Sequence, residues 1–151
     1  EWEKQVHRIA RHRNDRLVVK VPRDSETKQL RRWMDAWLKA ELRRQAESRI
    51  DIWAGRMNVL PTKWGIRPMK TKWGSCNPDK RIIWLNAELA KKPERMLDYV
   101  IVHELAHLIS PKHDNRFTAV LDREMPRWRE IRRELNDLPL AAWENKSSHG
   151  Q

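Results

Sequence analysis

The chain has 151 residues, which is enough for one domain with a buried core, and it carries a net charge of +11. Its single cysteine excludes an internal disulfide and agrees with a reducing compartment, so we expect a cytoplasmic protein. No apolar run approaches the length of a membrane-spanning helix, and we expect no membrane contact. The positive charge is spread along the chain, which suits a soluble basic protein and also makes nucleic acid a candidate partner.

The N-terminal third predicts one strand and one long helix. Residues 1–15 are charged and lack periodicity, and we expect them to be loose, whereas residues 16–21 (RLVVKV) are typical of a strand that stops at Pro22. A polar residue, Asp24 or Ser25, can cap the helix that follows. Apolar residues then recur at helical spacing, with arginines, lysines and glutamates between them, until Gly55. We therefore expect an amphipathic helix that ends near Gly55.

The middle of the chain predicts a β-hairpin. Residues 61–68 are bounded by prolines, and we expect a loop there. Residues 69–76 alternate in polarity as a strand does. Asn-Pro-Asp-Lys at 77–80 is typical of a turn, and residues 81–86 form the return strand.

A second helix is expected to begin after a short helical turn at residues 88–92. Pro93 is tolerated in the first turn of a helix. Pro111 disfavours helical geometry in the residue before it, so the helix should end near Ile109 or Ser110.

This second helix carries His103, Glu104 and His107 in the spacing H-E-x-x-H within an apolar run. Residues four apart lie on one face of a helix, so the two histidines converge on one point, with Glu104 close by. Burying three ionisable groups in such a segment is costly unless a partner satisfies them. A metal ion bound by two imidazoles beside a carboxylate does so, whereas the alternative is a pair of histidines four apart by chance.

His113 is the preferred third ligand, because the chain can turn at Pro111 and bring it back to the helix. Catalytic zinc sites usually take three protein ligands and leave the fourth position for water. The bland alternative is that His113 is a surface residue. Five carboxylates remain open as other third ligands: Asp98, Asp114, Asp122, Glu124 and Glu130.

Two known classes of metalloenzyme share parts of this pattern. The spacing of the three histidines is that of the metzincin proteases, but Ser110 stands where they have glycine, and Met125 is a poor candidate for their methionine turn because it lies in a segment expected to be helical. Peptide deformylases pair a cysteine with such a helix. Their glycine-rich motif is absent here, so Cys76 is interpreted as a packed thiol.

The C-terminal part predicts two further helices. Asp114 can cap a helix over residues 116–121, and a last helix is expected over residues 126–138. The tail from residue 144 is polar, and we expect it to be loose.

Together, residues 70–76 (KTKWGSC), residues 97–108 (LDYVIVHELAHL), His113 and Phe117 resemble the YgjP-like metallopeptidase family, which is related to the SprT-like and other zincin peptidases. The resemblance covers about residues 16–140. The chain departs from the family after the third histidine, where Asp114 and Thr118 replace the common serine and tryptophan.

The resemblance implies an α+β fold: a compact zincin-like domain with a small antiparallel or mixed sheet, a long amphipathic helix and a central H-E-x-x-H helix. It also implies one zinc ion per chain on His103, His107 and His113, with Glu104 as catalytic base. We expect one metallopeptidase domain over residues 1–151.

Peptide hydrolysis is the leading functional hypothesis, with an edge strand near residues 73–75 to hold the substrate and Tyr99, Asn115 or Arg116 as weak candidates for oxyanion donors. One alternative is a basic nucleic-acid-binding module whose metal site is structural or degenerate, with Cys76 as a fourth ligand. Another is hydrolysis of a non-peptide amide at the same site. The sequence does not reveal the substrate or the oligomeric state, and three imidazoles also accept cobalt, nickel or iron.

Overall fold

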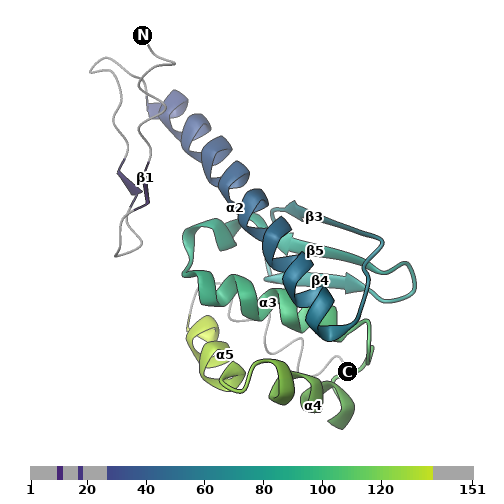
Figure 1. Ribbon diagram of the computed structural model, residues 1–151. Helices are drawn as coiled ribbons and strands as arrows, with labels where there is room; N and C mark the ends of the chain where they lie inside the picture. Colours follow the sequence, from purple (N-terminus) through teal and green to yellow (C-terminus); the bar gives the residue numbers. More distant parts are fainter. Residues whose placement is uncertain (1–9, 12–16, 19–26, 138–151) are drawn as a thin grey trace.

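The computed structural model describes residues 10–11, 17–18 and 27–137 (Figure 1). It is a mixed α+β domain, as expected. Its elements in chain order are β1 (Ala10–Arg11), β2 (Leu17–Val18), α2 (Thr27–Met57), β3 (Lys63–Arg67), β4 (Gly74–Asn77), β5 (Ile82–Asn86), the 3-10 helix η1 (Ala87–Lys91), α3 (Glu94–Ala106), α4 (Asn115–Glu124) and α5 (Trp128–Asn136).

The N-terminal strands form a small sheet of their own. β1 and β2 pair antiparallel, with Ala10 opposite Val18 and Arg11 opposite Leu17. The prediction for residues 16–21 is confirmed for Leu17–Val18, and β1 falls within residues that we expected to be loose. Several other predictions lie outside the described residues: those for the remainder of residues 1–21, for a helix cap at Asp24 or Ser25, and for a loose tail from residue 144.

The long helix α2 is amphipathic, as predicted, and continues slightly beyond its expected end. Its buried residues recur at helical spacing and face the core: Leu38, Leu42, Ala46, Ile50, Ala54 and Met57. The helix ends at Met57 and is followed by Asn58, whose φ of 54° is left-handed. The amide of Asn58 donates to Gly55 O and that of Val59 to Ala54 O, which is the Schellman arrangement. Gly55 is therefore an exposed residue within the helix and not its terminator.

The main sheet has three strands in the order β3-β5-β4. The predicted hairpin is confirmed, because β4 pairs antiparallel with β5 across the turn at residues 78–81. The loop predicted for residues 61–68 is wrong, since β3 runs parallel to β5 over five residues. Gly65 permits this pairing: a Cβ there would lie 2.4 Å from the ring of Trp84 on β5.

The predicted first strand of the hairpin is shorter than expected, because only residues 74–77 belong to β4. The preceding backbone is held by Asn86 of β5, whose amide donates to Trp73 O at 2.9 Å and whose buried side chain bonds to the residues before it. Its Nδ2 donates to Met69 O at 3.0 Å and to Lys72 O at 2.7 Å, and its Oδ1 accepts from the amide of Glu88 at 3.0 Å. One asparagine thus sets where β4 begins and caps η1.

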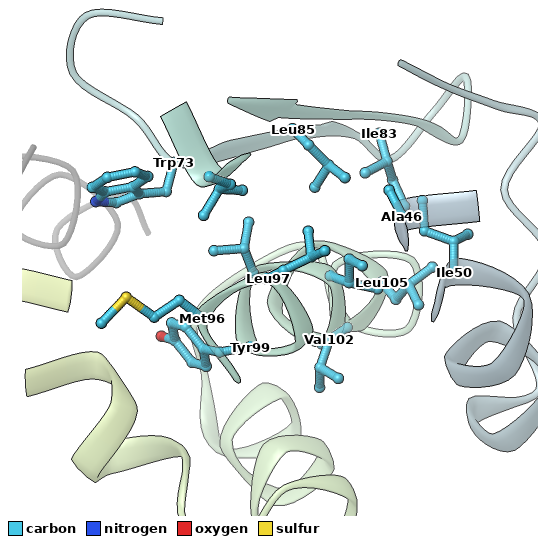
Figure 2. Packing of buried hydrophobic residues seen from close by; sticks show 14 of the residues in the cluster. Ala46, Ile50, Trp73, Ile83, Leu85, Met96, Leu97, Tyr99, Val102 and Leu105 are labelled. Carbon is cyan, nitrogen blue, oxygen red and sulfur yellow. The ribbon is translucent and has the colours of Figure 1, made fainter. Parts of the chain in front are cut away.

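The helix α3 is central to the core, lying between the strands and the pair α4 and α5 (Figure 2). Every residue from Tyr99 to Ala106 is buried, so the helix has no solvent face in this stretch. Side chains from the sheet and α2, such as Leu85 and Ile50, complete the core around it. Among the described residues, none of the helices combines the length and apolar character that crossing a membrane requires.

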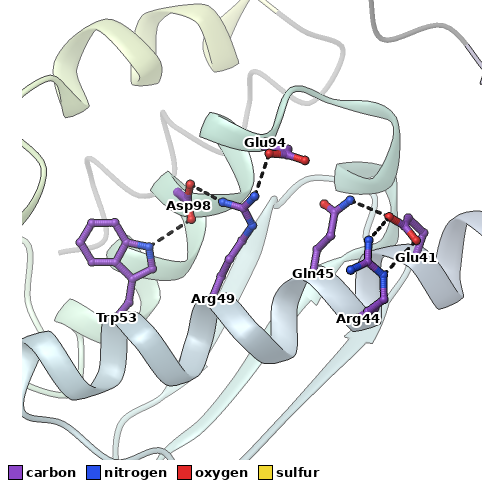
Figure 3. Close-up of polar contacts among 7 residues, drawn as sticks. All are labelled: Glu41, Arg44, Gln45, Arg49, Trp53, Glu94 and Asp98. Atoms are coloured by element: carbon purple, nitrogen blue, oxygen red, sulfur yellow. Dashed lines mark hydrogen bonds and ion pairs between the residues drawn. The ribbon is translucent and has the colours of Figure 1, made fainter. Parts of the chain in front are cut away.

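A polar contact fixes α2 against the first half of α3 (Figure 3). Arg49 of α2 donates to Asp98 at 2.6 Å and to Glu94 at 2.8 Å. Trp53, one turn further along α2, donates to the other carboxylate oxygen of Asp98 at 3.1 Å. Both donors engage Asp98 in a part-buried setting, so the contact sets the position of α3 along α2.

The last two helices are confirmed with shifted ends. Asp114 caps α4 as predicted, accepting from the amide of Phe117 at 3.0 Å. Met125 is the C-cap of α4, outside the helix in which we expected it. The final helix α5 begins at Trp128, two residues after the expected start at Pro126, and packs Trp128, Ile131 and Leu135 into the core.

Candidate metal centre

The last turn of α3 places three ionisable side chains inside the protein. His103 and Glu104 are each 3 % exposed, and His107 is 9 % exposed. The helical spacing brings the imidazole of His103 next to that of His107, with ring centroids 5.2 Å apart. The helix is buried from Tyr99 to Ala106, so the three groups are largely removed from bulk water.

The α-helix itself ends at Ala106, earlier than the expected Ile109 or Ser110. His107 is the C-cap, and tighter turns continue the chain, with Leu108, Ile109 and Ser110 donating to carbonyls of residues 105 and 106. The helical turns that follow α3 do end at Ser110, directly before Pro111, as predicted. The chain then reverses and returns His113 to the helix end.

The structure brings His103, His107 and His113 together. One ligand atom from each lies within 4.8 Å of the others. The Nε2 atoms of His103 and His113 are 3.3 Å apart. Two nitrogens bound at about 2.05 Å to one tetrahedral ion lie about 3.3 Å apart, so these residues fit a zinc-sized ion. Without a cation, two imidazole nitrogens at this distance can share at most one proton.

Burial keeps the three imidazoles neutral. It lowers the pKa of His103 well below its usual range, and the neighbouring His107 and His113 lower it further. Burial is also the main reason that the pKa of His107 falls to about 4. The pKa of His113 is lowered by burial and by the positive charge of Arg132. Divalent metals bind the neutral form of imidazole, so these shifts favour a metal site at neutral pH.

Contacts behind the rings orient two of the histidines. The Nδ1 of His107 lies 3.1 Å from Pro111 O, which makes Nδ1 the donor and leaves Nε2 as the free acceptor. The Nδ1 of His103 lies 3.4 Å from the hydroxyl of the buried Tyr99. Phe117 packs against all three rings, with centroid distances of 4.7 to 5.0 Å. Such outer contacts hold metal-binding histidines in a productive orientation.

A second set of contacts fixes the loop that carries His113. The hydroxyl of Ser110, only 3 % exposed, donates to Asp114 Oδ1 at 2.8 Å. The same oxygen caps α4 through Phe117, so the loop is tied to both helices. These two hydrogen bonds lower the pKa of Asp114. Ser110, at the position of the metzincin glycine, thus closes the loop by a side-chain bond.

Strand β4 passes directly beside Glu104. A Cβ on Gly74 would lie 2.8 Å from Glu104 Oε2 and 2.7 Å from Val100 Cγ1, so only glycine fits without displacing its neighbours. Cys76 lies two residues further along the same strand, and its thiol interacts electrostatically with the carboxylate of Glu104. Its pKa is raised to about 12, mainly by burial and then by that charge. The strand and the carboxylate of Glu104 therefore lie side by side, next to the helix turn that carries His103.

The other candidate ligands lie elsewhere. Every one of the five carboxylates has another partner: Asp98 with Arg49 and Trp53, Asp114 with Ser110, Asp122 with Trp128 and Arg129, Glu124 with Arg123, and Glu130 with Arg127. In the described part of the chain, the group of potential ligands around His103 contains neither a carboxylate nor Cys76. Of the suggested oxyanion donors, Asn115 and Arg116 are exposed, and Tyr99 contacts His103 instead.

Sequence reasoning did not find the positioning roles of Gly74, Ser110 and Phe117. Each depends on contacts between segments that are distant in the chain or separated by a turn. A local signal existed for Ser110 alone, because serine four residues before a helix-capping aspartate can bond to it.

Two solved structures share the fold. One is the metallopeptidase zymogen abylysin of Pyrococcus abyssi, with 22 % identity, a TM-score of 0.56, and coverage of 60 % of this chain and 90 % of that one. The other is the zymogen jannalysin of Methanocaldococcus jannaschii, with 24 % identity, a TM-score of 0.53, and coverage of 60 % and 92 %.

The chain belongs to the YgjP-like family, whose metallopeptidase domain matches residues 2–138. This confirms the resemblance drawn from the W-G-S-C and H-E-L-A-H segments. No match to a curated protein was found.

Proposed function

We propose that the chain is a zinc-dependent peptidase in which His103, His107 and His113 hold the metal and Glu104 is the general base. The observation that carries the proposal is the convergence of three neutral imidazoles within 4.8 Å at the end of a helix, beside a buried glutamate. The peptidase unit that we propose takes up the whole chain, residues 1–151.

His103, His107 and His113 would hold a zinc ion, which would supply Lewis-acid chemistry for activating water and polarising a carbonyl group. The carboxylate of Glu104 would accept the proton of the attacking water and deliver it to the departing amine. Burial of Glu104 beside Gly74 limits its side chain to a narrow range of positions, which favours proton transfer over a fixed distance.

The substrate is expected to bind along β4. This strand is an edge of the sheet, because the strand order places β5 in the middle. An extended peptide can therefore add to it by main-chain hydrogen bonds. Gly74 is in contact distance of Glu104, so a peptide paired with this strand passes the proposed base.

The number of ligands separates a catalytic from a structural metal site. Structural zinc sites are closed by four protein ligands, whereas catalytic sites leave one position open. The described residues supply three imidazoles and no fourth ligand. The cluster therefore favours a catalytic site over the structural one that a pure binding module would contain.

The test combines metal analysis with peptide hydrolysis in wild type and Glu104→Gln. We expect about one zinc per chain in both proteins and loss of about 10²- to 10⁴-fold in kcat in the variant. His113→Ala serves as the contrasting variant and should lose both metal and activity. Turnover that survives in Glu104→Gln would refute the proposed base, and full zinc occupancy in His113→Ala would refute the proposed third ligand.

A further inference from the structure

The main sheet has a face that no described helix covers. The core side chains of the sheet, Ile66, Ile83 and Leu85, point toward α2 and α3. Figure 1 shows α2, α3, α4 and α5 on that same side. Side chains alternate along a strand, so the residues between them belong to the opposite face.

This open face carries an aromatic ring between two cations. The register places Gly65 opposite Trp84, so Lys63, Arg67 and Trp84 share the open face. The indole lies across Gly65, whose missing side chain leaves room for it. The guanidinium of Arg67 lies over the ring, 4.4 Å from its centroid, and the ammonium of Lys63 lies over it at 5.8 Å. Both cations are exposed, and the ring is partly exposed.

The segment that builds this face is strongly basic. Residues 61–86 contain six cationic side chains, namely Lys63, Arg67, Lys70, Lys72, Lys80 and Arg81, and a single acid, Asp79. Within the described part of the chain, none of the six forms an ion pair with a carboxylate. By contrast, Arg44 and Arg49 on α2 and Arg95 on α3 are paired with acids. The excess positive charge of this segment, including that of Lys63 and Arg67 on the open face, is therefore available to a partner.

We propose that the open face of the sheet binds single-stranded nucleic acid: the exposed side chains of Lys63 and Arg67 move from the Trp84 ring onto phosphates, and a base takes their place against the ring. Cations beside an aromatic platform on a sheet are the chemistry that such strands require, since every base offers a flat face and every phosphate a charge. Duplex DNA buries its base faces and leaves Trp84 without a role. An acidic peptide would use the cations but not the ring.

The proposal is tested by the fluorescence anisotropy of fluorescein-labelled dT20 and rU20 with the full chain at several salt concentrations. The double variant Lys63→Glu/Arg67→Glu removes the two cations that flank the ring. Arg32→Glu/Lys39→Glu, at exposed positions of α2, makes the same change in net charge away from the sheet. We expect binding to weaken by about tenfold or more in the sheet variant and less than about threefold in the α2 variant.

The salt dependence gives a second measure. Loss of two phosphate contacts should reduce the slope of log K against log salt by about 1.4 in the sheet variant. Trp84→Leu should weaken binding by about fivefold or more with an unchanged slope, because stacking is uncharged. Circular dichroism and urea unfolding check that each variant is folded.

Several results would overturn the proposal. Absence of dT20 and rU20 binding at 50 mM salt is one, and an equal loss in the two double variants is another, because it would show only diffuse attraction. Tighter binding to a 20-base-pair duplex than to dT20 would also contradict the stacking role. So would stronger association with vesicles of 30 % phosphatidylserine in phosphatidylcholine, which would identify a membrane as the partner.

Discussion

Gly74→Ala is expected to disturb the proposed base and the core at once. The added Cβ would meet Val100 Cγ1 at 2.7 Å and Glu104 Oε2 at 2.8 Å, whereas ordinary contacts begin near 3.4 Å. One of the partners must therefore move by about 0.7 Å, and Val100 is itself fully buried. Overpacking of this kind typically costs about 1–3 kcal/mol of the free energy of unfolding.

The effect on catalysis should exceed the effect on stability. If Glu104 yields, its carboxylate leaves the position for proton transfer, and a displacement of about 1 Å can cost about 100-fold in rate. We expect kcat/KM for a quenched fluorescent peptide to fall by about this factor. Urea unfolding, followed by tryptophan fluorescence, measures the change in stability in the same preparation.

Gly55→Ala is the matched control. It also adds one methyl group to a glycine, but at an exposed position of α2 where the Cβ meets nothing within 4 Å. Alanine is the better helix former there, so the free energy of unfolding should rise by about 0.5–1 kcal/mol with unchanged activity. If Gly74→Ala stays within 0.5 kcal/mol and twofold of wild type, the reasoning about contact with Glu104 is wrong.

Three other outcomes follow from the site. Ser110→Ala removes the hydrogen bond to Asp114, the cap of α4, and should weaken zinc binding through His113 by about 10- to 100-fold, measured in competition with a chelating dye. Ser48→Ala, at an exposed position of α2, is the control, and equal zinc affinities in the two variants would contradict the role of Ser110. In EDTA, the free energy of unfolding should be greatest above about pH 7 and should fall as the pH drops from 6.5 toward 4. The reason is that His107 takes up a proton in the unfolded chain at a higher pH than in the folded protein, where its pKa is about 4. A flat profile over this range, or an equal decline in His107→Gln, would contradict the burial of a neutral His107. Cys76, with a pKa of about 12, should react with iodoacetamide at pH 8 about a thousand times more slowly in the folded than in the unfolded protein, and equal rates would show that the thiol is not buried as described.

Local patterns were sufficient for much of the fold. The spacing of apolar residues in α2, the turn at residues 77–80 and the cap at Asp114 each act over a few neighbouring positions, and the structure confirms them. Pairing between distant strands has no local signature. For that reason β3, a short strand bounded by prolines, was predicted as a loop: its partner β5 begins fifteen residues after β3 ends.

The same division applies to the proposed site. Helical periodicity by itself determined that His103 and His107 share one face, and Pro111 determined that the helix stops before His113. Only the tertiary structure decided that β4 runs beside Glu104 and that Ser110 ties the loop to α4. The physical reason is the distance along the chain over which each interaction acts. Helical spacing and caps depend on residues within one turn of helix, whereas contact between segments depends on how the whole core packs.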